Sequence, residues 1–240
     1  KIKWGNRKSE LAIRELECWG SLAQEKGFSF PYAKWEDAWK KILLNQFHDI
    51  LPGSSIARVN DEAAVLYDEV IQFSNQVAEE AAYHLAGEGE ALVVFNSLSW
   101  ERDMVLKKAD GNYTRVKVPA CGYTEICESS LPVDEHVTMV EKDGMIVLEN
   151  KHVCAVFNHE GELVSFVRKE SGREFAAGPM NRFMLFKDVP RTFDAWDIDS
   201  CYEQELIGYW SDVEIHMLEN NPYRCTIQIQ KKIGNSFIQQ

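Results

Sequence analysis

Apolar residues in the first third of the chain recur at the spacing of an α-helix. They form runs over residues 12–23, 35–46 and 56–77, and the last run alternates steps of three and four residues. The loops between these runs are only a few residues long, which forces sequential helices to pack as neighbours. We therefore predict a three-helix bundle over residues 1–88, with Trp19, Trp35 and Trp39 in its core.

The ends of two helices can be predicted from single residues. Ser54 and Ser55 are candidate N-caps of the third helix, and Gly87 is expected to end it. Proline disfavours helical geometry in the residue before it, so Pro52 ends the second helix. This places His48 and Asp49 in the last turn of that helix.

After residue 89 the spacing of apolar residues changes to two, which is typical of strands. Lys142–Gly144 and Asn158–Gly161 have the composition of hairpin turns. Strands at this density predict an antiparallel β-sandwich over residues 89–240. We expect it to be truncated, because the last strand lacks an evident partner. The expected strands are residues 91–95, 104–106, 115–118, 137–140, 145–148, 153–157, 163–167 and 225–231.

Composition excludes several classes of function. The chain has 240 residues, a hydrophobic fraction of 45% and a net charge of −12, without a basic stripe that would attract nucleic acid. No apolar run approaches the roughly 20 residues that cross a bilayer. Six cysteines are scattered without a CxxC pair, which favours free thiols over disulfides and a cytoplasmic location. A signal peptide upstream of Lys1 is left open.

One segment of the bundle carries candidate chemistry, the run LLNQFHDILPGSSI at residues 43–56. A histidine at a helix C-terminus usually satisfies the final carbonyls, and residue type alone favours that structural role for His48. A metal-binding role is the alternative, with Asp49 beside it facing a ligand. A catalytic zinc site needs about three protein ligands, and the sequence has no second histidine at ligand spacing.

A second acidic segment lies at residues 188–199. Asp197 and Asp199 would share a face if the chain is extended there, and such a pair suits a cation or sugar hydroxyls. A solvated loop is an equal alternative. Trp196 is either a platform for a sugar ring or a core residue.

Three stretches resemble the α-mannosidases of glycoside hydrolase family 38. They are NQFHDILPGSSI at 45–56, ALVVFNSLSW at 91–100, and DVP followed by FDAWDI at 188–198, and the last is similar to the cytosolic or vacuolar branch. The resemblance implies that residues 1–88 are the middle domain and residues 89–240 the start of the C-terminal β region.

The resemblance also implies roles for individual residues. His48 matches a ligand of a Zn²⁺ ion, although another divalent ion is compatible, and Asp49 matches a residue that binds hydroxyls of mannose. Asp197 is a further candidate for substrate binding. Family members hydrolyse α-mannosides with retention, and their catalytic carboxylates belong to an N-terminal domain of the same chain. We therefore assign no catalytic residue here and expect the 240 residues alone to be inactive.

A non-enzymatic carbohydrate-binding or adaptor module is the alternative function. A helical bundle joined to a β-sandwich fits it, as does the lack of a complete catalytic constellation. It does not explain the sequence Gln-Phe-His-Asp at the end of a helix. The expected partners are an α-mannoside or oligosaccharide and the N-terminal domain, with neither nucleic acid nor a membrane; a homo-oligomer is compatible with the sequence.

Overall fold

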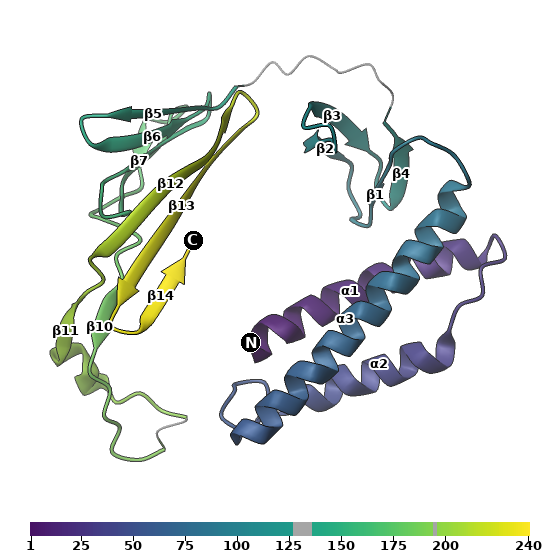
Figure 1. The fold of residues 1–240 in the computed structure, drawn as a ribbon, viewed down its shortest axis with the longest axis horizontal. Coiled ribbons are helices and arrows are strands. Elements are labelled where there is room, and N and C mark those ends of the chain that lie inside the picture. Colours follow the sequence, from purple (N-terminus) through teal and green to yellow (C-terminus); the bar gives the residue numbers. More distant parts are fainter. Residues whose placement is uncertain (127–135, 194–195) are drawn as a thin grey trace. The chain divides into compact units, whose positions relative to one another are not determined.

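The computed structural model describes residues 1–126, 136–193 and 196–240. It divides into two compact units, residues 1–108 with 114–130 and residues 109–113 with 131–240. The predicted change from helix to strand occurs where α3 is followed by β1 (Figure 1). The domain boundary between residues 88 and 89 stays a prediction. Within the described residues, no helix is both long and apolar enough to cross a bilayer.

The first unit begins with three helices, as predicted. They are α1 (Ile2–Gln24), α2 (Tyr32–Asn45) and α3 (Ala57–Ala86), and α1 packs along α3. Their apolar stripes meet in the core, where Leu16 and Ile42 are 0% exposed and Val70 is 1% exposed. Burial of an aliphatic side chain of this size stabilises the fold by about 1.5–3 kcal/mol. The period of three to four residues in the sequence is therefore the period of the buried face.

Three tryptophans of the bundle pair their indole N–H groups with glutamates of α1. The indoles of Trp35 and Trp39 both donate to Oε1 of Glu17, at 2.8 and 2.7 Å. Trp19 donates to Oε2 of Glu15 at 2.9 Å. The rings pack on the apolar core, which confirms the predicted core role of these residues. A buried indole needs a partner for its N–H, and the carboxylates supply one at the edge of the core.

The end of α3 was predicted correctly and its beginning was not. Gly87 follows the last helical residue with a φ of 80°, a conformation that favours glycine. At the other end the N-cap is Ile56, which has no hydrogen-bonding side chain. Ser55 does not cap the helix because its hydroxyl donates to the carbonyl of Asp49 instead. That bond closes the loop between α2 and α3.

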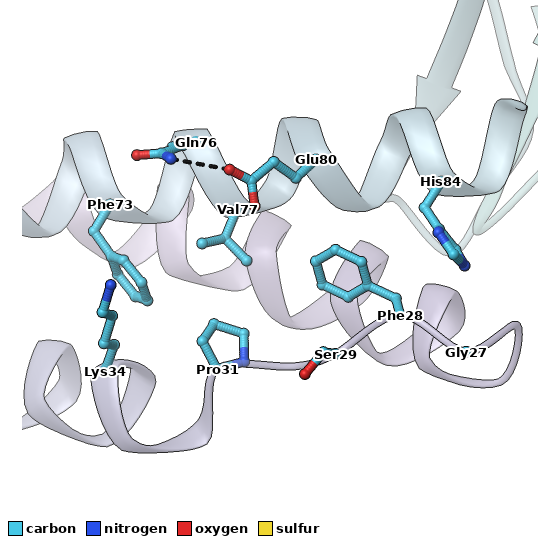
Figure 2. A pocket seen from close by; sticks show the side chains of 10 residues that line it. All are labelled: Gly27, Phe28, Ser29, Pro31, Lys34, Phe73, Gln76, Val77, Glu80 and His84. Carbon is cyan, nitrogen blue, oxygen red and sulfur yellow. Dashed lines mark hydrogen bonds between the residues drawn. The ribbon is translucent and has the colours of Figure 1, made fainter. Parts of the chain in front are cut away.

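A groove opens between α3 and the loop that leads into α2 (Figure 2). Its volume is about 530 Å³. Phe28 from the loop and Phe73 from α3 both line it. The groove belongs wholly to the helical part of the first unit.

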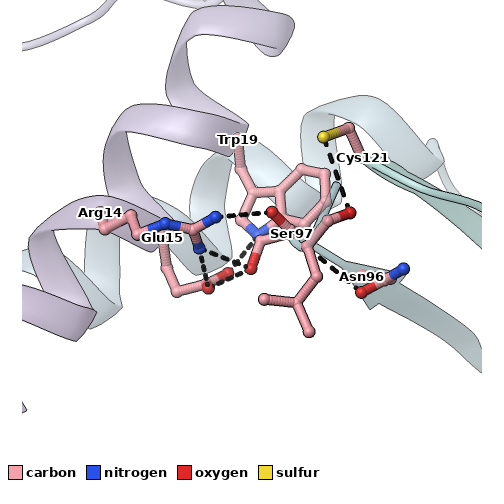
Figure 3. A network of polar contacts seen from close by, with 7 residues as sticks. Arg14, Glu15, Trp19, Asn96, Ser97 and Cys121 are labelled. Carbon is pink, nitrogen blue, oxygen red and sulfur yellow. Dashed lines mark hydrogen bonds and ion pairs between the residues drawn. The ribbon is translucent and has the colours of Figure 1, made fainter. Parts of the chain in front are cut away.

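Two small sheets follow α3, and all of their residues except Tyr113 belong to the first unit. In one, β1 (Val93–Asn96) pairs with β4 (Gly122–Glu125), and in the other β2 (Arg102–Lys107) pairs with β3 (Tyr113–Val118). Side chains of α1 hold the chain just after β1 (Figure 3). Arg14 donates to the hydroxyl and the carbonyl of Ser97, at 3.0 and 2.8 Å, and the Ser97 hydroxyl donates to Glu15. These bonds attach the first strands to the bundle.

The second unit contains a five-stranded antiparallel sheet in sequential order. The predicted turns are confirmed, since residues 143–144 lie between its first two strands and residues 158–162 between its third and fourth. The strands are β5 (Thr138–Lys142), β6 (Met145–Glu149), β7 (Val153–Phe157), β8 (Leu163–Arg168) and β9 (Arg173–Glu174).

The rest of this unit forms two further antiparallel sheets. One pairs β10 (Met184–Phe186) with β11 (Leu206–Tyr209), and a short 3₁₀ helix, η1 (Ser200–Gln204), precedes β11. In the other, β13 (Arg224–Ile233) lies between β12 (Asp212–Asn221) and β14 (Ser236–Gln239). The expectation that the strand at 225–231 lacks a partner was wrong, because both of its neighbours lie in this chain.

Candidate functional site

The segment singled out in the sequence forms the loop between α2 and α3. The prediction that His48 and Asp49 lie in the last helical turn was wrong, because α2 ends at Asn45 and both residues follow it in a series of turns. The carbonyl of Phe47 accepts from the amides of Ile50 and Leu51, at 2.9 and 3.0 Å, and so starts a new turn. His48 and Asp49 therefore belong to the loop between α2 and α3 and not to the helix.

His48 and Asp49 form an exposed pair on this loop. Nε2 of His48 lies 3.5 Å from a carboxylate oxygen of Asp49, and the two side chains are 70% and 50% exposed. The ring of Phe47 lies 4.3 Å from the imidazole, centroid to centroid. An imidazole held outside the core and next to a carboxylate is accessible to a metal ion or a ligand.

The backbone before this pair is held by contacts with the other two helices. Tyr67 of α3 donates its hydroxyl to the carbonyl of Asn45 at 3.2 Å, which gives this helix-end carbonyl a partner. The side-chain amide of Gln46 donates to Asn6 and Glu10 of α1, at 3.0 and 2.9 Å. The side chains of Asn45 and Tyr67 are 2% and 1% exposed. All three helices thus fix the point where the loop leaves α2.

The donor atoms at this loop suit a divalent metal in kind but not in number. Imidazole nitrogen and carboxylate oxygen are both common zinc ligands, and a catalytic zinc ion takes about three protein ligands. Among the described residues, no three His, Cys, Asp or Glu side chains come close enough together to hold an ion. This loop therefore fits one part of a metal site and not a whole one.

The acidic segment after β10 belongs to the second unit, whereas His48 belongs to the first. Asp197 is exposed, and its carboxylate accepts the amide of Ile198 at 2.9 Å. The amides of Trp196 and Asp197 donate to the carbonyl of Phe193, which has a φ of 57°. Trp196 is 60% exposed, so it is not a core residue. Asp194, at the start of the predicted segment, lies outside the described residues.

Asp199 has a different environment from Asp197. Arg191 binds it with two guanidinium nitrogens and its own backbone amide, at distances of 2.9–3.3 Å. Because these bonds favour the charged carboxylate, they lower the pKa of Asp199. Asp199 thus stabilises the base of the loop, whereas Asp197 is accessible to a ligand.

The chain matches two family models. Residues 1–85 match the model described as alpha mannosidase middle domain, and residues 148–240 match glycosyl hydrolases family 38 C-terminal domain. The chain belongs to glycoside hydrolase family 38. The matches place the His48 loop in the middle domain and the Asp197 segment in the C-terminal domain of the family.

Curated relatives are much longer than this family 38 chain. Alpha-mannosidase 2C1 of Homo sapiens is 36% identical over 214 residues, which are 82% of this chain and 21% of the relative. Alpha-mannosidase G of Dictyostelium discoideum is 23% identical, over 95% of this chain and 26% of its own length. The chain thus spans about a fifth to a quarter of these relatives.

A solved structure supports the fold of this family 38 chain. A protein in glycosyl hydrolase family 38 from Enterococcus faecalis superposes with a TM-score of 0.72 at 16% identity. The match covers 96% of this chain and 36% of that one. The order of elements seen here therefore recurs in a protein of the same family.

Sequence reasoning missed the contacts that hold the His48 loop. Hydrogen bonds tie the side chain of Gln46 to α1, and the side chain and carbonyl of Asn45 to α3. A signal was available for Asn45, because an amide on the buried face of a helix needs hydrogen-bond partners. No such signal marks Tyr67, because a tyrosine on the apolar stripe of a helix is usually a core residue.

Proposed function

We propose that this chain is part of a metal-dependent retaining α-mannosidase that hydrolyses terminal α-linked mannose from oligosaccharides or mannosides. Within it, His48 is a ligand of Zn²⁺ or another divalent ion, and Asp49 and Asp197 bind the substrate. The observation that carries the proposal is the exposed His48–Asp49 pair on a loop fixed by all three helices. Membership of family 38 and the names of its mannosidase relatives support the choice of reaction.

The two residues of the pair have different tasks in this proposal. His48 donates a nitrogen lone pair, which requires a neutral ring. Asp49 accepts hydrogen bonds from sugar hydroxyls, which a carboxylate does with charge-assisted strength. A bound zinc ion would add electrostatic stabilisation and help to orient the sugar. Asn45 and Gln46 keep the backbone under the pair in place, so that neither residue has to be ordered by the ligand.

The remaining parts of the active site lie outside this chain in the proposal. A carboxylate nucleophile and a general acid are required for hydrolysis with retention, at a separation of about 5–5.5 Å. We assign them to an N-terminal catalytic domain, so the 240 residues alone should be inactive. We also infer that the sheets of the C-terminal region pack as a β-sandwich and that the protein is cytoplasmic. The half-buried strands and the scattered cysteines support these two inferences.

Metal analysis of the whole protein tests the role of His48. His48→Ala should lower zinc affinity by on the order of 100-fold or more, because even groups that only orient a ligand change metal affinity by 10–100-fold. Hydrolysis of a chromogenic α-mannoside should fall with metal content. His216→Ala is a matched control, since His216 is another exposed imidazole, 3.6 Å from the carboxylate of Glu214. Full zinc content and activity in His48→Ala would defeat the proposal.

The two carboxylates are tested in the same assay. Asp49→Asn should lower kcat/KM for the mannoside by about 10–100-fold while zinc content stays near that of the wild type, because the change removes charge from a substrate contact. Asp197→Asn should have a smaller effect in the same direction. An unchanged kcat/KM in either variant removes that residue from the substrate site. Undetectable hydrolysis by the metal-loaded wild type would favour a non-enzymatic carbohydrate-binding module instead.

A further inference from the structure

The groove beside α3 combines apolar surfaces with a polar rim. Its volume of about 530 Å³ is within the range of about 300–1,000 Å³ that is typical of ligand sites. Phe28 and Phe73 present half-buried aromatic rings to it, and Figure 2 shows both rings in the space between α3 and the loop. Pro31 and Val77 line the surface between them.

The polar rim carries groups of opposite charge. Lys34 stands at one end, next to Phe73, and Glu80 and Gln76 lie along α3 (Figure 2). The amide of Gln76 donates to Glu80 at 2.9 Å and so orients the carboxylate. At the other end, Nε2 of His84 lies 3.0 Å from the carbonyl of Lys26. Since a carbonyl only accepts, Nε2 is the donor in this contact.

This set of groups narrows the chemistry of a ligand. The carboxylate of Glu80 disfavours phosphates, and the ammonium of Lys34 disfavours cations. A purely apolar ligand would leave the rim groups without partners after displacing their water. A neutral molecule with several hydroxyls satisfies both kinds of group, because a hydroxyl donates to Glu80 and accepts from Lys34. The aromatic rings suit the apolar face of a sugar ring.

The groove is separate from the loop that carries His48. It lies at the N-terminal end of α2, and His48 follows the C-terminal end. With 14 residues in the helix and a rise of 1.5 Å per residue, the two places are on the order of 20 Å apart. A sugar in the groove would thus not occupy the proposed mannose site.

We propose that this groove is a second, non-catalytic glycan-binding site that holds a branch of an oligosaccharide away from the reacting sugar. The choice of mannose as the sugar rests on the proposed function, whereas the class of ligand rests on the groove itself. Contacts by Phe28, Phe73, Lys34 and Glu80 provide the binding. A remote site of this kind favours branched glycans over small mannosides by raising the effective concentration of the substrate.

Photo-crosslinking of the whole protein tests this proposal. The probe is mannotriose that carries a diazirine, and labelled peptides are identified by mass spectrometry. We expect crosslinks in the segments 27–34 and 73–84. Ser29→Trp should block the groove and reduce these crosslinks at least tenfold, because Ser29 lines the groove and is exposed. Ser21→Trp is the matched control, the same change at an exposed position of α1 outside the groove.

Two outcomes overturn the proposal. One is the absence of crosslinks in both segments, and the other is labelling of these segments that Ser29→Trp and Ser21→Trp leave equally strong. Neither outcome depends on hydrolysis, so failure of the mannosidase proposal and failure of the groove proposal are distinguishable. A protein that does not cleave mannosides but is labelled in the groove retains the second site.

Discussion

The helical bundle and the five-stranded sheet bury their side chains to different degrees. In the bundle, Leu16 and Ile42 are 0% exposed, whereas every residue of β7 is only half-buried. The stripe of a helix is covered by the other two helices of the same unit. A strand with apolar residues on both faces is fully covered only by a layer on each side. The local sequence therefore predicts which side chains of the bundle are buried. For the five-stranded sheet it predicts where the strands lie, but not how far their side chains are buried.

The helical bundle and the second unit also differ in the polar groups that they bury. Lys231 of β13 is 1% exposed, donates to the carbonyl of Asn181 at 2.9 Å, and lies 5.3 Å from the ring centre of Phe183. Burial lowers its pKa. Glu162 is 5% exposed nearby. Among the buried residues of the three helices, the polar ones are the uncharged Ser9, Asn45 and Ser74. Charge is therefore part of the interior of the second unit but lies at the edge of the bundle core.

The largest effect is expected from Leu16→Ala in the bundle. Removing a fully buried leucine should lower the free energy of unfolding of the helices by about 3 kcal/mol, through lost burial and the cavity left behind. Hydrogen exchange of the α1 and α3 amides measures this effect. Leu11→Ala, on the same helix but at a position 50% exposed, should change protection little. If the β13 amides lost protection to the same extent, the bundle and the second unit would unfold together, and the expected difference in their stability would be wrong.

In the second unit, Glu162→Gln tests whether a buried charge contributes to stability. Arg182 donates to both oxygens of Glu162, at 2.5 and 3.1 Å, and these bonds lower the pKa of the carboxyl below its ordinary value of 4.5. A group whose pKa is lowered on folding stabilises the fold above its unfolded pKa, and this contribution disappears as pH falls through the folded value. The variant should thus lose about 2 kcal/mol at neutral pH and progressively less below about pH 4.

Protection of the β13 amides at neutral and acidic pH measures this difference. Glu160→Gln is the matched control, because Glu160 lies on the same turn but is exposed. A pH-independent loss in Glu162→Gln would show that the side chain acts through its shape and not through its charge.

The smallest effect is expected at the end of α3. Gly87 has a φ of 80° and open space where a Cβ would lie, so Gly87→Ala should destabilise the helix by about 1 kcal/mol through backbone strain alone. Gly89 lies two residues later without a positive φ, and Gly89→Ala should be neutral. Hydrogen exchange of the amides in the last turn of α3 measures the difference in stability between the two variants. Equal protection in both would indicate that packing, and not the glycine, ends this helix.

The sequence predicted the regular elements better than their ends and partners. The strand predicted at 153–157 is β7, residue for residue. Strand β12 was missed although Val213 and Ile215 alternate with polar residues, because a bulge at Met217–Glu219 breaks the period of two. The other neighbour of β13, strand β14, was also missed. Alternation is a local signal, and a bulge removes it without ending the strand.

The residues of the candidate site could be predicted from the sequence, but the backbone conformation around them could not. The motif drew attention to His48 and Asp49, and Pro52 placed them in a helix. The hydrogen bonds that shape the end of α2 come from Tyr67 and from α1, far away in the sequence. Proline marks where a helix can no longer continue, whereas long-range partners decide where it stops.

The hydroxyl of Tyr67 on the carbonyl of Asn45 makes the loop after α2 a product of the whole bundle. A substitution on α3 or α1 would move the imidazole and the carboxylate without touching either. Variation at Asn6, Glu10 or Tyr67 between related proteins would therefore be a means of tuning what the loop holds, with the residues on the loop unchanged.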